Sequence, residues 1–163
     1  LSTRRRGTMP GFSSTSTKGL SSTDRVTVIG GSGFVGRHLV RLLAKSGADV
    51  RVGVRDLEAA LFLKPYGDVG QIVPWQVDIN DPAQVATAVH GANVVVNLVG
   101  ILYERGLRTF ERIHVHGSAN VAKAAAEAGA DRFLHMSALG ADPGSLALYG
   151  RTKYAGEEAV KAV

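Results

Sequence analysis

Tyr149 and Lys153 form the pair of residues whose types and spacing most directly suggest chemistry. They lie four residues apart in the segment "LYGRTKYAGEE", which has helical character, so the two side chains share one helix face. A neighbouring cation favours the phenolate form of a tyrosine, which allows such a pair to move a proton. The pair is therefore a candidate proton-transfer couple. The alternative is a plain helix face on which the lysine extends to solvent.

A glycine-rich segment, "VIGGSGFVGRHLV", carries the strongest binding signal. Its G-x-x-G-x-x-G pattern stands between a predicted strand and a predicted helix, which is the setting of a dinucleotide fingerprint. The first glycine permits a tight turn, the second lets the backbone approach a pyrophosphate, and the third lets the helix pack closely. The helix amino end offers free N–H groups to the phosphates, although a glycine-rich turn that binds nothing is the alternative. The residues that we expect at the cofactor are Gly30, Ser32, Gly33, Phe34, Val35, Gly36 and Arg37.

The end of the second predicted strand bears on which nicotinamide cofactor is bound. An acidic residue there would hold the ribose 2′-OH of NAD, whereas an arginine can pair with the 2′-phosphate of NADP. The sequence places Arg55 at this point, in "VGVRD", and Arg37 could assist. NADPH is therefore favoured over NAD. Two alternatives stay open, because a strand ending one residue later would present Asp56, and Arg55 could be an ordinary surface arginine.

Polar residues follow two further predicted strands, at the sheet edge where ligands bind in such folds. Asp78 in "QVDI" could accept a hydrogen bond from an adenine amino group, with Ile79 beside it, or could simply belong to a turn. Asn97 and Gly100 in "NLVG" lie where the fourth strand leaves the sheet. Asn97 could face the cofactor or could tie down backbone groups of its own loop.

These residues require a scaffold in which strands and helices alternate. Valine-rich apolar segments predict the strands, and apolar residues at helical spacing, such as Phe34, Leu39, Leu42 and Leu43, predict the helices. The alternation implies right-handed crossovers and a Rossmann-like, doubly wound parallel α/β sheet of order 3-2-1-4-5. Pro74 predicts an edge position or an irregularity for the third strand. The predicted strands are 25–29, 49–54, 71–77, 92–100 and 132–137, and the predicted helices are 34–47, 81–90, 109–128 and one carrying Tyr149.

The chain divides into a front segment, 1–24, and a body, 25–163, that we expect to be one NADP(H)-binding domain. The front segment is rich in Ser, Thr and Arg and has no acidic residue before Asp24. It also lacks hydrophobic periodicity, so we expect a disordered or extended tail. The same composition is typical of a mitochondrial targeting segment or its remnant.

Charge, cysteine content and histidine spacing exclude several classes of site. Four basic residues and one acidic residue give the front segment +3 of the chain's net +5, which leaves the body nearly balanced and gives little reason to expect nucleic-acid binding. There is no cysteine, and His114 and His116 face different sides of a predicted helix, so we expect no metal site. The most apolar run, "ANVVVNLVGIL", is too short to span a bilayer.

Together these motifs resemble the extended and atypical short-chain dehydrogenase/reductase superfamily over residues 25–163. The matching features are the glycine pattern, Asp78, "NLVG", Ser137 after the fifth strand, and the Y-x-x-x-K pair. Two segments, "PYGDVGQIVPWQVDINDPAQVATAVHGANVVVNLVG" and "ALYGRTKYAGEEAV", are most similar to one branch, the nucleotide-binding accessory subunit of mitochondrial respiratory complex I and its bacterial relatives. That branch carries a Gly-Asp-(Leu/Val)-Gly-Gln segment, which occupies 67–71 here.

The branch resemblance implies a tightly held NADPH with a structural role. It implies assembly with the other subunits of respiratory complex I, on the matrix side of the mitochondrial inner membrane, peripheral to the membrane and away from the path of electron transport. In such a subunit Lys153 would hydrogen-bond the nicotinamide ribose, and with Tyr149 it would anchor the cofactor rather than catalyse.

The superfamily resemblance implies an alternative, an active NADP-dependent reductase, dehydrogenase or epimerase. There Tyr149 would transfer a proton during hydride transfer, Lys153 would support it, and Ser137 would steady the substrate carbonyl. Three features favour the non-catalytic interpretation: His114 stands where many active members have asparagine, 11 residues separate Ser137 from Tyr149, and we expect the carboxyl-terminal substrate region to be absent from this chain. A redox-sensing regulator that reads NADP(H) is a third candidate.

Overall fold

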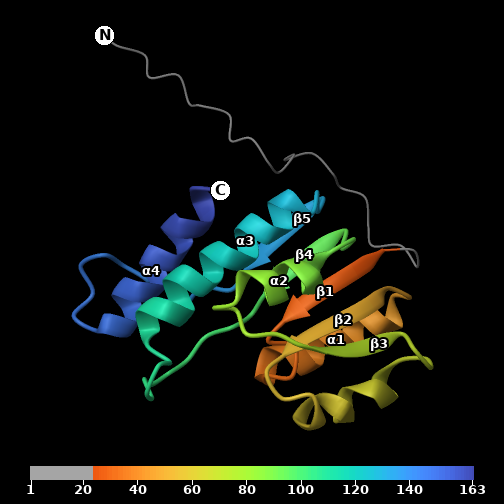
Figure 1. Ribbon diagram of the computed structural model, residues 1–163. Coiled ribbons are helices and arrows are strands. Elements are labelled where there is room, and N and C mark those ends of the chain that lie inside the picture. Colours follow the sequence, from red (N-terminus) through yellow and green to blue (C-terminus); the bar gives the residue numbers. More distant parts are fainter. Residues whose placement is uncertain (1–23) are drawn as a thin grey trace.

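A computed structural model describes residues 24–163, so the prediction of a tail over 1–24 lies, apart from Asp24, outside the described residues. Five parallel strands form one sheet in the order β3-β2-β1-β4-β5, as Figure 1 shows, which confirms the predicted topology. Pro74 lies in β3, at the edge of the sheet, where its missing N–H costs no ladder bond. The strands are β1 (Arg25–Ile29), β2 (Asp49–Val54), β3 (Ile72–Gln76), β4 (Val94–Asn97) and β5 (Arg132–His135).

Helices cover both faces of the sheet (Figure 1). One face carries α1 (Phe34–Lys45), which packs against a 3₁₀ helix, η1 (Glu58–Tyr66). The other carries α2 (Pro82–Val89), α3 (Ser118–Glu127) and α4 (Leu148–Lys161), of which α3 touches both of the others. A π-helix, η2 (Glu111–Gly117), leads directly into α3 and packs against α4.

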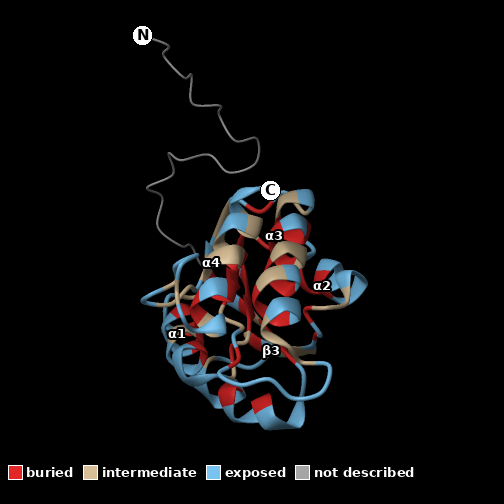
Figure 2. Cartoon of the chain, turned by 90° about the vertical axis from the view of Figure 1, so that its left-hand side faces the viewer, coloured by how far each residue is buried: buried red, intermediate tan, exposed pale blue. Residues whose placement is uncertain are grey.

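The hydrophobic core has two halves, one on each side of the sheet. Alternate residues of β1 and β4 supply them, because successive side chains of a strand point to opposite faces. Val26 and Val28 pack under α1, whereas Ile29 and Val95 pack under α2 and α3. Figure 2 shows these buried residues on the strands and on the inward faces of the helices.

The loop before β3 is fixed by Gln71, the last residue of the 67–71 segment. Its Nε2 donates to the carbonyls of Ala44 and Ala48, at 2.7 and 3.0 Å, and its Oε1 accepts from the Asp68 N–H at 2.9 Å. A Cβ at Gly67 would lie 2.6 Å from this Oε1, so a side chain there would displace the glutamine. Gln71 and Gly67 thus join the end of α1 to the start of β3.

The sequence-based helix boundaries hold at α2 and over 109–128, whereas the π character of the latter's first part and the 3₁₀ helix η1 were not predicted. The Asp81 side chain accepts from the N–H groups of residues 83 and 84 at the start of α2, as predicted. The predicted helix 109–128 consists of η2 followed by α3. The apolar spacing of 34–47 is only partly a core face: Phe34 and Leu42 are 77% and 64% exposed, while Gly36, Val40, Leu43 and Ala44 are buried. Phe34 lies about 200° around the helix from Gly36, which faces the sheet.

Candidate nucleotide-binding site

An open cavity of about 460 Å³ lies at the carboxyl edge of the sheet, where the loops after β1, β2, β3 and β4 meet. Its volume falls within the roughly 300–1,000 Å³ that small-molecule sites occupy, and its place is the switch point where doubly wound sheets bind ligands. Seven of the residues expected at the cofactor line it: Gly30, Ser32, Gly33, Arg55, Asp78, Ile79 and Gly100.

The turn between β1 and α1 owes its shape to two glycines. Gly30 has φ of +83°, which a residue with a side chain rarely adopts, and its N–H donates to the Gly53 carbonyl at 2.8 Å. A Cβ at Gly36 would lie 2.5 Å from the Gly31 carbonyl oxygen, so α1 touches the turn directly. No side chain caps the first turn of α1 and no acidic residue lies in it, which leaves its N–H groups and partial positive charge for an anion.

The other residues expected from this turn, 34–37, do not line the cavity. The Phe34 and Val35 side chains are exposed, and Phe34 packs edge-on against His38. Arg37 lies over the Phe62 ring and donates from Nε to the Gly33 carbonyl at 3.5 Å. The side chains of residues 34–37 therefore do not face an anion in the cavity, and their contribution to binding it would come from the backbone.

Arg55 is the first residue after β2 and is exposed in the cavity wall. Within residues 24–163 no carboxylate forms an ion pair with it. Asp56 lines the same cavity, but its Oδ1 accepts from the N–H groups of Glu58 and Ala59, at 3.0 and 3.2 Å. The carboxylate thus caps η1, while the guanidinium keeps its capacity for a ligand.

Asp78 follows β3, and its contacts agree with both interpretations that the sequence left open, a cofactor contact and a turn residue. It lines the cavity, and its Oδ1 also accepts from the backbone and side-chain N–H groups of Asn80, at 2.9 and 3.0 Å. The adjacent Ile79 is buried, and its Cδ1 meets the space that a Cβ at Gly117 would need.

Asn97 supports the loop after β4 and does not line the cavity. It is fully buried. Its Nδ2 lies 3.3 Å from both the Ser118 hydroxyl and His135 Nδ1, and its Oδ1 accepts from the Val99 N–H at 3.1 Å. The sequence left open whether Asn97 faces the cofactor or holds backbone groups of its own loop, and the structure shows the second role.

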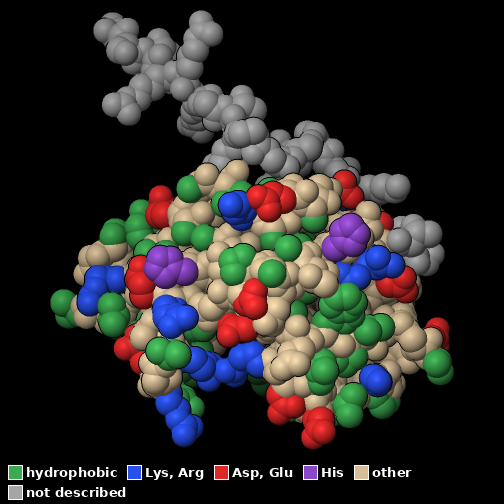
Figure 3. All heavy atoms as spheres, viewed as in Figure 1, with side chains coloured by type: hydrophobic (Ala, Val, Ile, Leu, Met, Phe, Trp, Pro, Cys, Tyr) green, Lys and Arg blue, Asp and Glu red, His purple; other side chains and the backbone are tan. Residues whose placement is uncertain are grey.

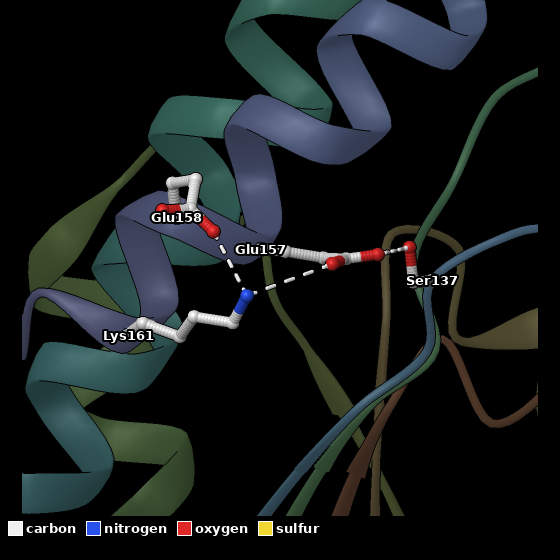
Figure 4. Close-up of polar contacts among 4 residues, drawn as sticks. All are labelled: Ser137, Glu157, Glu158 and Lys161. Atoms are coloured by element: carbon white, nitrogen blue, oxygen red, sulfur yellow. Dashed lines mark hydrogen bonds and ion pairs between the residues drawn. The ribbon is translucent and has the colours of Figure 1, made fainter. Parts of the chain in front are cut away.

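Lys153 and Ser137, from the candidate catalytic set, are both held by protein groups. Lys153 is 3% exposed and donates from Nζ to the Met136 carbonyl at 2.7 Å. Burial lowers the pKa of its ammonium, and the Glu157 carboxylate opposes that shift. The Ser137 hydroxyl donates to Glu157, whose other oxygen lies 3.9 Å from Lys161 Nζ (Figure 4). Neither residue lines the cavity.

Tyr149 stands in the first turn of α4, also outside the cavity lining. Its ring packs edge-on against His114 and Phe110, with centroids 5.3 and 5.9 Å away. The structure therefore places Tyr149 and Lys153 on one helix, as predicted, without bringing Ser137 to the tyrosine.

A family profile described as NAD(P)H-binding matches residues 30–162. This chain belongs to that NAD(P)H-binding family. It is 35% identical to the mitochondrial NADH-ubiquinone oxidoreductase 40 kDa subunit of Neurospora crassa, over 84% of the chain and 36% of that protein. It is 40% identical to the mitochondrial NADH dehydrogenase [ubiquinone] 1 alpha subcomplex subunit 9 of Arabidopsis thaliana, over 88% and 37%.

A third relative of this NAD(P)H-binding chain has a different name. The chain is 36% identical to the ceramide reductase of Caulobacter vibrioides, over 84% of the chain and 42% of that protein. The chain thus spans only 36–42% of the length of these three relatives. Among solved structures, Pen from Bacillus thuringiensis matches with a TM-score of 0.76 at 23% identity, covering 85% of this chain and 46% of that one, which shows the shared fold.

Several residues of the cavity wall in this NAD(P)H-binding domain escaped the sequence reasoning. Arg108 is the charged one, and its buried Nε has no hydrogen-bond partner within the described residues. It lies at the end of a tight turn after β4, in which residues 105 and 108 pair and Gly106 has φ of +56°. The glycine is a local signal for the turn, but it does not show that the turn brings Arg108 to the cavity. The other unpredicted wall residues include Gly53, Val54, Ala59, Leu98, Val99 and Ile113.

Other kinds of site find no support in the residues that the structure describes. No group of three or more His, Cys, Asp or Glu residues between 24 and 163 could hold a metal ion. No helix in that range is long and apolar enough to cross a membrane. On the face drawn in Figure 3, Lys and Arg are interspersed with Asp and Glu, without the one-signed patch of a nucleic-acid surface.

Proposed function

We propose that this chain is the NADP(H)-binding part of an accessory subunit of mitochondrial respiratory complex I, and that it holds its cofactor without turnover. The observation that carries the proposal is an open cavity of about 460 Å³ on the β1–α1 turn, in a chain similar to complex I subunits of both a fungus and a plant. The other complex I subunits are then its partners. Its location is the matrix side of the inner membrane, peripheral to the bilayer.

The residues of the cavity wall indicate where each part of the cofactor would lie. The diphosphate lies over Gly30, Ser32 and Gly33, where the backbone and the uncapped end of α1 favour negative charge. The adenosine half extends toward β2 and β3, with the adenine beside Asp78. Arg108 supplies a further cation from the opposite side of the cavity.

Arg55 favours NADP(H) over NAD(H). It follows β2 at the position that meets the adenine ribose, and among residues 24–163 it has no carboxylate partner to neutralise it. The Asp56 carboxylate, which would favour the 2′-OH of NAD, uses one of its oxygens to accept from two N–H groups at the start of η1. A 2′-phosphate would pair with the free guanidinium.

Holding without turnover is supported by the state of the candidate catalytic residues. The Ser137 hydroxyl is committed to Glu157, so it is not free to hydrogen-bond a substrate carbonyl. Lys153 is buried on the tyrosine face of α4, and its Nζ donates to the Met136 carbonyl rather than into the cavity.

The decisive experiment isolates the native full-length protein and follows its bound nicotinamide. The proposal predicts that the protein co-purifies with complex I and that its NADPH fluorescence persists while the complex oxidises many equivalents of NADH. A protein recovered free of complex I subunits, or bound NADPH that is oxidised at the rate of NADH, would overturn it.

A second candidate function is an active NADP-dependent reductase. Similarity to a bacterial ceramide reductase favours it, together with the placement of Tyr149 and Lys153 on one helix face. In that case the full-length protein reduces a carbonyl substrate with NADPH, and Tyr149→Phe abolishes the reaction because the proton donor is lost. Lys153→Met should lower the same activity, since it removes the cation beside the tyrosine.

A further inference from the structure

His114 is completely buried, yet the proposed function gives it no role. It lies in the π-helix η2, between the loop that forms the β4 side of the cavity and the helix α4. Single-turn π segments within helices occur frequently at functional sites, because the extra residue redirects a side chain. His114 stands in the middle of this π segment, and its side chain points into the protein interior.

The hydrogen bonds around His114 fix the position of every proton. The Ile101 N–H donates to Nε2 at 3.1 Å, so Nε2 carries no proton. Nδ1 must then carry it and donates to the Thr152 hydroxyl at 3.0 Å. That hydroxyl in turn donates to the Tyr149 carbonyl at 3.1 Å. The imidazole is therefore neutral, in its Nδ1–H form, and each donor in the chain has one acceptor.

These hydrogen bonds connect the wall of the cavity after β4 to the helix α4, which carries Tyr149 and Lys153. Ile101 directly follows Leu98, Val99 and Gly100, which line the cavity. Thr152 lies on α4 immediately before Lys153. Helix α4 also touches η2 directly through backbone, since a Cβ at Gly156 would overlap the His114 carbonyl oxygen. Motion of the cavity wall relative to α4 would break at least one of these contacts.

We propose that His114 is a positioning residue that locks the 98–101 wall of the cavity to the Tyr149–Lys153 turn of α4. The proposal rests on the proposed function, in that the cavity must bind NADP(H). The locked part is the one nearest the nicotinamide, because Arg55 and the adenine side lie across the sheet, toward β2 and β3. His114 does not touch the cofactor and acts through Ile101 and Thr152.

The groups that face the imidazole from the surrounding elements keep it neutral. Burial lowers the pKa of His114 to about 4, with Lys153 of α4 and His135 of β5 acting in the same direction. Glu104, from the loop after β4, opposes the shift. A second proton would sit on Nε2 and face the Ile101 N–H, donor against donor.

The first test reads the tautomer directly by ¹⁵N NMR of the histidine side chains in the full-length protein. We expect an unprotonated Nε2 and a protonated Nδ1 for His114 at neutral pH. An Nε2–H tautomer, or rapid exchange between tautomers, would overturn the proposal. This readout needs no nucleotide, so it stands apart from any failure of NADP(H) to bind.

The second test compares Thr152→Val, which removes the hydroxyl at nearly constant volume, with the matched control Thr152→Ser, which keeps it. We expect Thr152→Val to weaken NADPH binding roughly tenfold, as the loss of a buried hydrogen-bond connection would, and Thr152→Ser to bind like the parent. His114→Gln should retain more affinity than His114→Phe, because its amide still accepts from Ile101.

The outcomes separate a positioning role from a structural one. If folded Thr152→Val and His114→Phe proteins bind NADPH as tightly as the parent, the residues serve stability alone and the proposal is wrong. If His114→Phe does not fold, the Thr152 pair decides. If the parent itself binds no NADP(H), the proposed function fails. The tautomer measurement still tests whether His114 connects Ile101 to Thr152.

Discussion

Gly36 shows how one residue position links packing to binding. Its missing Cβ lets α1 rest on the Gly31 backbone, which aims the helix amino end at the cavity. We expect Gly36→Ala to destabilise the protein by about 1–3 kcal/mol, since α1 must shift to admit the methyl group. Urea unfolding measures this.

Gly33→Ala is the matched control, because a Cβ there would meet the Gly30 carbonyl oxygen at 3.3 Å, a much milder approach than at Gly36, and the position is exposed. Its effect on unfolding should be smaller than that of Gly36→Ala. Equal destabilisation by the two changes would show that the close approach at Gly36 is unimportant.

The proposed preference for NADP(H) also depends on a single residue, Arg55. We expect Arg55→Ala to weaken NADPH binding by roughly 10–100-fold and to leave NADH binding within about twofold, because a charge-assisted bond to the 2′-phosphate is lost. Titration of the two nucleotides by calorimetry measures the ratio. Arg37→Ala is the control, since Arg37 lies over Phe62 outside the cavity wall. Parallel losses for both nucleotides would contradict the assignment.

At the scale of elements, Gln71 explains why a short polar segment precedes β3. Its side chain donates two hydrogen bonds to carbonyls at and just after the end of α1, and it accepts a third from Asp68 in its own loop. We expect Gln71→Glu to lower the free energy of unfolding by about 1–3 kcal/mol, because two carbonyls lose their donor and face a carboxylate. Thermal unfolding at neutral pH checks this.

Gln76→Glu is a suitable comparison for Gln71→Glu. Gln76 is exposed and makes a single 3.5 Å contact, to the Arg55 carbonyl. The same chemical change there should have an effect below about 0.5 kcal/mol. If Gln71→Glu is as mild as this comparison, the account of the 67–71 segment is wrong.

Elements that depend on local signals could be predicted from the sequence, and those that depend on tertiary packing could not. Asp81 and Pro82 predict the amino-terminal cap of α2, and the alternation of strands and helices predicts the strand order. The π turn of η2 is different: it forms where His114 must reach Ile101 and Thr152, which are distant in sequence. Arg108 was missed for a similar reason, since its loop position is set by pairing with residue 105.

At the scale of the whole molecule, one buried histidine, His114, and one half-buried histidine, His135, make stability depend on pH. Burial lowers the pKa of His114 and of His135 to about 4, with Lys153 acting in the same direction on both. Between the ordinary histidine pKa of about 6.5 and pH 4, the unfolded chain therefore takes up protons that the folded protein refuses.

We accordingly expect the contribution of these histidines to the free energy of unfolding to be level above about pH 6.5 and to fall as the pH drops to about 4, by on the order of 3 kcal/mol for His114 alone. Urea unfolding at a series of pH values measures the slope. His90→Gln, at an exposed histidine, should leave that slope unchanged, whereas stability that rises on acidification through this window would contradict the assignment.

The most direct test of the central claim is the identity of the nucleotide in the full-length protein as purified from its own cells. Denaturation followed by mass spectrometry of the released small molecules gives both identity and stoichiometry. We expect about one NADP(H) per protein molecule, because the glycine turn, the uncapped end of α1 and Arg55 together suit a 2′-phosphorylated dinucleotide. Release of no nucleotide, or of NAD(H) alone, would contradict the account.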